Sequence, residues 1–186
     1  MTIASRLKQW MQGDTAAAAT APPAPEMRVL MVCMGNICRS PIAEGVLRGR
    51  LAQAGLLGRV VVDSAGTHGY HTSEAPDPRA IRLAAKRGYA LSAQRARPVQ
   101  LEDFGNFDWL LAMDEDNLTW LHKRAPAQHA ARLELLMSHA RMHPGVVAVP
   151  DPYYGPDAGF EQVLDLVEDA CDGVLVRLQS ELAGKA

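Results

Sequence analysis

The chain alternates short apolar runs with longer stretches of helical periodicity. Four runs of mostly apolar residues are short enough to be buried strands, at 27–32, 59–64, 107–113 and 132–137. Between them, apolar residues recur three and four positions apart, which predicts helices that begin at Pro41, Pro78 and Asp114. Strands that alternate with helices predict an α/β fold in one domain, with a central four-stranded parallel twisted sheet and helices on both faces.

The C-terminal part of the chain predicts a loop followed by one more helix. Two prolines and a glycine make Pro150–Pro156 irregular, and Asp157 is expected to cap the helix that follows. One face of this helix is apolar and carries Phe160, Val163, Leu164, Val167, Cys171, Val174, Leu175 and Leu178. Cys171 is therefore expected to be a core residue.

The first 26 residues have a different composition from the rest. Helical spacing of apolar residues is found at Ile3, Leu7, Trp10 and Met11. One hypothesis is a short amphipathic helix that docks on a partner or a membrane surface. The favoured hypothesis is a frayed tail, because so short a helix is only marginally stable by itself. The Ala- and Pro-rich stretch 13–26 predicts a linker. We therefore expect a flexible N-terminal extension over 1–26 and a folded domain over 27–186.

Composition narrows the class of protein. The 186 residues are 48% hydrophobic and 22% charged, which is ordinary for a globular domain, and the net charge of −2 predicts no nucleic-acid partner. No apolar run approaches spanning length, and the N-terminus lacks a signal-peptide core. Three cysteines, two of them in one short loop, indicate a reactive thiol in a reducing compartment rather than a disulfide framework. The expected location is cytoplasmic.

The most informative stretch runs from Cys33 to Pro41. The loop between the first strand and the first helix would aim backbone N–H groups and a helix N-terminus at one point, which is how proteins bind phosphate. Gly35 allows close backbone approach, and Asn36 tolerates a left-handed conformation. Arg39 can grip two phosphate oxygens, and the Ser40 hydroxyl could donate to the Cys33 thiolate. The loop therefore predicts a thiolate aimed at a bound phosphate, a nucleophile for in-line attack.

Such an attack needs an acid for the departing oxygen, and Asp151 is the best candidate. It lies between two prolines on the downstream loop, although an Asp-Pro pair by itself is more often only a turn former. The consecutive aromatic residues Tyr153 and Tyr154 support the assignment of Asp151 as the acid, because aromatic walls suit an aromatic leaving group such as the phenol of phosphotyrosine. A pocket deepened in this way would leave phosphoserine too short to reach Cys33.

These motifs together resemble the low-molecular-weight protein tyrosine phosphatases. The likeness runs from about Met27 to the C-terminus and rests on several ordered segments, which are 33–41, 63–67, 76–80, 95–97, 113–117 and 151–155. The resemblance implies Cys33 as nucleophile, Arg39 as the residue that binds phosphate and stabilises the transition state, and Asp151 as general acid and then base. It implies phosphotyrosine proteins as substrates, inorganic phosphate as product, and no metal or organic cofactor.

The resemblance also assigns supporting roles. It implies a substrate site made by Met34, Gly35, Asn36, Ile37, Cys38, Ser40, Tyr70, Tyr153 and Tyr154. Asn36, Ser40 and Ser64 match a network that holds the loop. Gln94 lies near a position where many members have a histidine that braces the loop asparagine, and its amide is expected to make a similar bond to Asn36. Met34 occupies a variable position that should influence substrate preference. Cys38 matches a redox partner of Cys33, and a small loop filler is an equal alternative.

Three alternatives fit the sequence less well. Thioredoxin-coupled arsenate reductases resemble the same fold and phosphate-binding loop, but they need two further cysteines, and Cys171 is the one cysteine outside the loop. A phosphotyrosine-binding module without turnover would lack the nucleophile or the acid, yet both are present. His139 and His143 have metal-ligand spacing without a matching third ligand, so we expect a structural role. Bacterial relatives suggest a tyrosine kinase as a partner.

Overall fold

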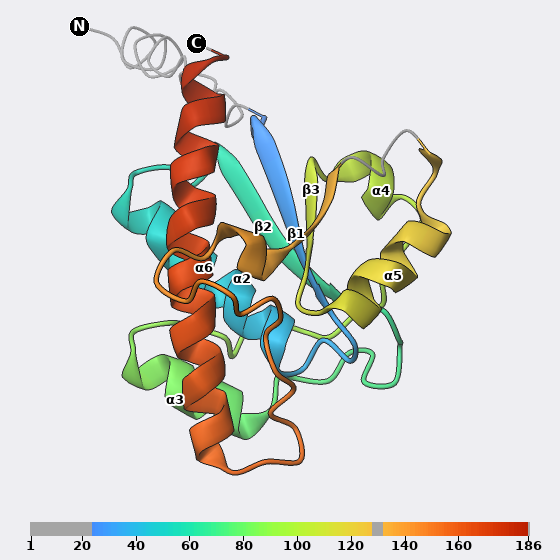
Figure 1. Cartoon of the computed structure of the whole chain (residues 1–186), viewed down its shortest axis with the longest axis vertical. Coiled ribbons are helices and arrows are strands. Elements are labelled where there is room, and N and C mark those ends of the chain that lie inside the picture. The colour runs from blue at the N-terminus through green and yellow to red at the C-terminus, as the bar shows by residue number, and fades with distance from the viewer. Residues whose placement is uncertain (1–23, 128–131, 186) are drawn as a thin grey trace, which may run out of the picture.

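The computed structural model describes residues 24–127 and 132–185, and these form one parallel sheet with helices on both faces (Figure 1). The strand order is β2-β1-β3-β4. The central strand β1 (Met27–Cys33) pairs with β2 (Val60–Gly66) on one side and β3 (Trp109–Ala112) on the other, and β4 (Leu133–Leu135) pairs with β3. The predicted α/β class and four-stranded parallel sheet are confirmed.

Helices cover the two faces of the sheet unequally. On one face lie α2 (Arg39–Gln53), α3 (Pro78–Lys86) and α6 (Asp157–Ala183), with the 3₁₀ turn η2 (Leu136–His139) packed on α6. On the other face lie α4 (Asp103–Asn106) and α5 (Glu115–Arg124) (Figure 1). None of the described helices is long and apolar enough to cross a membrane.

The apolar run of β1 is continuous because both of its faces are buried. Val29 and Met31 belong to the core shared with α2 and α6, whereas Leu30 and Val32 belong to the core shared with α4 and α5. Side chains of a strand alternate between faces, so a strand covered on both sides needs no polar positions. Cys171 is fully buried in the first of these cores, as expected.

Several element ends differ from the sequence-based expectation. The helix α2 begins at Arg39, two residues before Pro41, and β4 ends at Leu135, where the chain tightens into η2. Asp157 does not cap α6, because the N-cap residue is Pro156 and the Asp157 carboxylate instead accepts hydrogen bonds from Arg82. The short helix α4 was not predicted. The amphipathic pattern of 3–11 lies outside the described residues.

The strand order decides where the site can be. The chain leaves β1 toward β2 on one side of it and returns to β3 on the other, so the connections diverge at the carboxyl end of β1. A crevice at such a point is where open α/β sheets bind ligands. Cys33 is the last residue of β1.

Candidate active site

The loop from Cys33 to Arg39, here called the phosphate loop, turns sharply between β1 and α2. Asn36 adopts the left-handed conformation with φ of 57°, which an asparagine tolerates better than most residues. This turn brings the backbone N–H of Asn36 to 3.2 Å from the Cys33 sulfur, and α2 then begins at Arg39. The predicted left-handed role of Asn36 is confirmed.

The Cys33 sulfur lies at the floor of this loop among hydrogen-bonding groups. Its Sγ is 3.0 Å from the Ser40 hydroxyl, in addition to the Asn36 N–H, and the residue is almost completely buried. These contacts hold the sulfur at the carboxyl end of β1, close to the N-terminus of α2.

A buried network holds the loop from behind. The Asn36 side-chain amide donates to the hydroxyls of Ser40 and Ser64, each at 2.9 Å, and its carbonyl accepts from the backbone N–H of Arg97 at 2.9 Å. Ser64 in turn donates to Glu44 at 2.7 Å. Burial raises the pKa of the Glu44 carboxyl, although hydrogen bonds from Ser64 and Arg48 oppose this shift. The network joins α2, β1 and β2 around Cys33.

Gln94 does not belong to this network, so the expectation that it braces Asn36 is wrong. Both amide protons of Asn36 are already donated, and its carbonyl oxygen accepts from the Arg97 backbone. Gln94 instead donates its amide to the backbone carbonyl of Pro41 at 3.1 Å. Its support of the loop is thus indirect, through the first turn of α2.

Arg39 joins the phosphate loop to two other loops at the same edge of the sheet. Its Nη1 forms an ion pair with Asp114 and donates to the Val149 carbonyl at 3.2 Å, while its Nη2 lies 3.1 Å from Asp151 Oδ2. The guanidinium is buried, whereas the Asp151 side chain is about half exposed. The structure thereby brings together Cys33, Arg39 and Asp151, the three residues that the sequence singled out.

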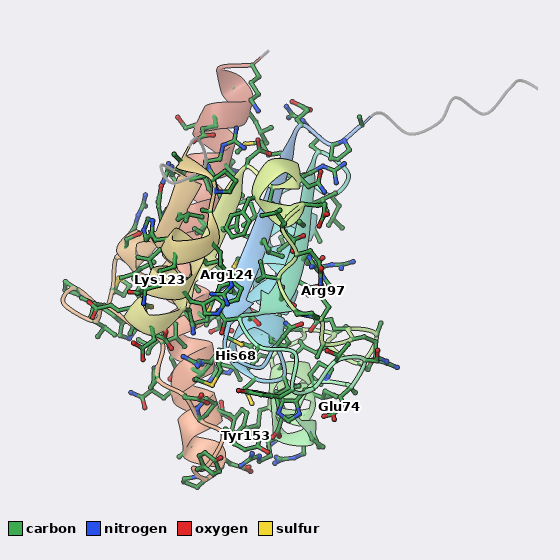
Figure 2. All side chains as sticks on the ribbon, turned by 90° about the vertical axis from the view of Figure 1, so that its right-hand side faces the viewer. His68, Glu74, Arg97, Lys123, Arg124 and Tyr153 are labelled. Atoms are coloured by element: carbon green, nitrogen blue, oxygen red, sulfur yellow. The ribbon has the colours of Figure 1, made fainter. Side chains whose placement is uncertain are left out.

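These residues open into a cavity of about 230 Å³ with aromatic walls. Tyr70 and Tyr154 are strongly exposed at its rim, and Tyr153 packs against Tyr154 with ring centroids 4.8 Å apart in an edge-to-face arrangement. Tyr153 and His68 lie in the lower half of Figure 2, His68 shortly after β2 and Tyr153 on the loop that precedes α6. The lining comprises Cys33, Met34, Gly35, Ile37, Cys38, Arg39, Tyr70, His71, Asp151, Tyr153 and Tyr154.

Of the predicted substrate-site residues, Asn36 and Ser40 do not line this cavity. Both side chains are buried behind the loop, where they orient it. Cys38 does line the cavity, and burial raises the pKa of its thiol. It is a free cysteine, as are Cys33 and Cys171.

Sequence reasoning missed two residues of the site. His71 lines the cavity and hydrogen-bonds Glu74, but nothing in a lone loop histidine distinguishes it. Asp114 pairs with Arg39 and caps α5 by accepting from the Asn117 N–H at 2.7 Å. Its position directly after β3 could have indicated it, because parallel strands end at the same edge of the sheet.

The two histidines with metal-ligand spacing have other partners. His143 Nδ1 lies 2.8 Å from Asp169, and the His139 ring stacks on Trp109. Within 24–127 and 132–185, no group of three or more His, Cys, Asp or Glu side chains is arranged to hold a metal ion.

Comparison with known proteins agrees with this geometry. The family model described as low molecular weight phosphotyrosine protein phosphatase matches residues 28–184. A low molecular weight protein-tyrosine-phosphatase of Streptomyces coelicolor is 44% identical over 161 residues, covering 86% of this chain and 98% of the relative. A human low molecular weight phosphotyrosine protein phosphatase is 39% identical over 149 residues, covering 79% and 92%. A solved protein tyrosine phosphatase of Entamoeba histolytica superposes with a TM-score of 0.81 at 39% identity, covering 86% and 99%.

Proposed function

Because this chain belongs to the low molecular weight phosphotyrosine protein phosphatase family, we propose that Cys33, Arg39 and Asp151 are its catalytic residues. The protein is a protein-tyrosine-phosphatase, which hydrolyses phosphotyrosine in proteins. The observation that carries the residue assignment is the convergence of a buried thiol, a buried guanidinium and a half-exposed carboxyl on one cavity.

The first step is an in-line attack by the Cys33 thiolate on the phosphorus atom. An S–P bond forms while the bond from phosphorus to the phenolic oxygen breaks, and that oxygen takes a proton from the Asp151 carboxyl. The N–H groups of the phosphate loop and the Arg39 fork stabilise the charge on the three equatorial oxygens. The products of this step are the free tyrosine side chain and a cysteinyl-phosphate.

The second step hydrolyses this intermediate. Asp151, now a carboxylate, accepts a proton from a water molecule whose oxygen attacks the phosphorus atom. The S–P bond breaks, inorganic phosphate is released, and the Cys33 thiolate is restored with the Ser40 hydroxyl and the Asn36 N–H beside its sulfur. The same carboxyl is therefore acid and then base.

The contact between Arg39 and Asp151 suggests how substrate binding prepares the acid. Arg39 Nη2 lies 3.1 Å from Asp151 and is one of the donors that a phosphate would use. A phosphate that takes this donor draws the guanidinium away from the carboxyl. The Asp151 carboxyl is then free to hydrogen-bond the phenolic oxygen, as the first step requires.

The walls of the cavity support a preference for phosphotyrosine. Tyr70, Tyr153 and Tyr154 stand above the loop, whereas the Cys33 sulfur is buried at the floor. A phenyl phosphate spans this depth and its ring packs against aromatic side chains, but phosphoserine is too short. Met34, nearly half exposed at the rim, would adjust preference among peptides.

Three further proposals concern redox regulation, the location of the enzyme in the cell and its substrate protein. Cys38 shares the cavity with Cys33. A peroxide that takes two electrons and two protons from these thiols, and is reduced to water or an alcohol and water, would leave a Cys33–Cys38 disulfide. This disulfide would inactivate the enzyme reversibly and protect the nucleophile from further oxidation. Reactive thiols of this kind suit a reducing compartment, which supports our proposal of a cytoplasmic enzyme. We propose a bacterial tyrosine kinase as the substrate protein.

The test compares phosphotyrosine and phosphoserine peptides under reducing conditions, with wild type, Cys33→Ser and Cys171→Ala side by side. We expect turnover of phosphotyrosine only, complete loss in Cys33→Ser, and wild-type activity in Cys171→Ala, which removes a buried thiol outside the lining of the cavity. Retained turnover in Cys33→Ser would refute the nucleophile. Equal turnover of both peptides would refute the depth argument.

A further inference from the structure

We propose that Arg79 is a positioning residue that ties the loop carrying the general acid to the phosphate loop. The loop 151–156 is called the acid loop here. The inference rests on the proposed roles of Cys33 and Asp151, and it concerns how their separation is fixed. Arg79 lies in the first turn of α3, outside the lining of the active-site cavity.

One side of the Arg79 guanidinium binds the acid loop. Its Nη1 donates to the Gly155 carbonyl and its Nη2 to the Tyr153 carbonyl, both at 2.9 Å. The guanidinium carbon also lies 4.5 Å from the centre of the Phe160 ring, at the start of α6. Two carbonyls of one turn, held by a single planar fork, fix the orientation of that turn more firmly than one bond could.

The other side of Arg79 connects to the phosphate loop through Asp77. Arg79 Nε and Nη2 donate to the two Asp77 carboxylate oxygens at 3.0 and 2.8 Å, and the backbone N–H of Asp77 donates to the Ile37 carbonyl at 2.8 Å. The Asp77 side chain is buried, and its hydrogen bonds with Arg79 lower its pKa, so the pair stays charged. Ile37 is part of the phosphate loop and lines the cavity.

This bridge matters because the acid has few other contacts. Asp151 Oδ2 contacts Arg39, and Asp151 Oδ1 accepts from the Tyr153 N–H at 3.1 Å. When a phosphate takes the Arg39 donor, the bond to Tyr153 remains, and Tyr153 is the residue whose carbonyl Arg79 holds. A displacement of about 1 Å can cost a catalytic group up to 100-fold in rate. Arg79 therefore keeps the acid at the right distance from the departing oxygen while substrate is bound.

The chain offers a matched control on the same helix. Arg82 lies three residues after Arg79 and pairs with Asp157, just beyond the acid loop, at 2.8 Å. Both side chains of this pair are about half exposed, and Arg82 touches no carbonyl of the acid loop. Surface ion pairs of this kind contribute little to stability. Removing Arg82 thus changes the charge of α3 by the same amount without breaking the bridge.

The experiment measures kcat/KM for aryl phosphates with good and with poor leaving groups. The value of kcat/KM reports the first chemical step, in which the acid acts. For Arg79→Gln we expect about a tenfold loss with phenyl phosphate, a poor leaving group, and less than about a twofold loss with 2,4-dinitrophenyl phosphate, which leaves without a proton. Arg79→Lys, a point charge that cannot span Asp77 and two carbonyls, should show a smaller loss of the same kind. Arg82→Gln should match wild type on both substrates.

Asp151→Ala, assayed in parallel, separates this inference from the proposed function. If Asp151→Ala loses both substrates equally, the acid assignment itself is wrong. If Asp151→Ala is selective for the poor leaving group but Arg79→Gln and Arg79→Lys lose both equally, or neither, the positioning role is refuted. Thermal unfolding of each variant shows whether it folds. If Arg79→Gln does not fold, the comparison is made with Arg79→Lys alone.

Discussion

Asn36 is the residue at which local conformation and buried polar contacts can be separated by experiment. It combines a left-handed backbone with a buried side chain that makes three hydrogen bonds, to Ser40, Ser64 and the Arg97 backbone. Alanine removes all three bonds and keeps the strained conformation. Glycine removes the same bonds but adopts positive φ freely.

The structure sets the size of both effects. Each lost hydrogen bond costs about 1 kcal/mol, and a left-handed conformation costs a non-glycine residue about 1–2 kcal/mol. We therefore expect Asn36→Ala to lower the free energy of unfolding by about 4 kcal/mol and Asn36→Gly by about 3 kcal/mol. Both variants lack the same three hydrogen bonds. The difference of about 1 kcal/mol between their free energies of unfolding therefore measures what the left-handed conformation costs alanine relative to glycine.

Urea unfolding followed by tryptophan fluorescence gives these values. Asn106→Ala is the control, because Asn106 is exposed at the end of α4 and its replacement should change stability by less than about 0.5 kcal/mol. Equal stability of the alanine and glycine variants would refute the backbone argument. A loss below about 1 kcal/mol in both would show that the three bonds do not stabilise the loop.

Two further predictions concern the packing of α6. A Cβ at Gly173 would lie 2.0 Å from the His139 carbonyl oxygen, so Gly173→Ala should force η2 and α6 apart and lower the free energy of unfolding by about 3 kcal/mol. Thermal unfolding measures this, and a Tm unchanged from wild type would contradict it. Burial opposes ionisation of Asp169, but the N–H groups of 141–143 and the His143 ring outweigh it and lower the Asp169 pKa. A lowered pKa in the folded state stabilises the protein above the unfolded-state value near about 4, and this stabilisation is lost as the pH falls through the folded-state pKa. Asp169→Asn should therefore be less stable than wild type at pH 7, with a difference that shrinks below about pH 4; a difference constant between pH 7 and 3 would contradict the assignment.

The sequence alone determined the parts of this protein that short-range physics controls. The alternation of apolar runs with helical periodicity gave the parallel sheet and its covering helices. The phosphate loop could also be predicted from the sequence. Its key residues lie within eight consecutive positions, and their spacing fixes how the strand turns into the helix; they are Cys33, Asn36, Arg39 and Ser40. Asn36 could be assigned a left-handed conformation from its own side chain.

Tertiary structure decided which distant groups meet. Arg39 binds Asp114 across 75 positions, Arg79 binds the Tyr153 carbonyl across 74, and the Arg97 backbone reaches Asn36 across 61. The last of these occupies the place expected for Gln94, which shows that a residue type near the right position does not identify a hydrogen-bond partner. Periodicity and turn preferences act over a few residues, whereas such pairings depend on how strands and helices pack. For this reason the sequence specified Cys33 and its loop, and only the fold placed the groups that surround Asp151.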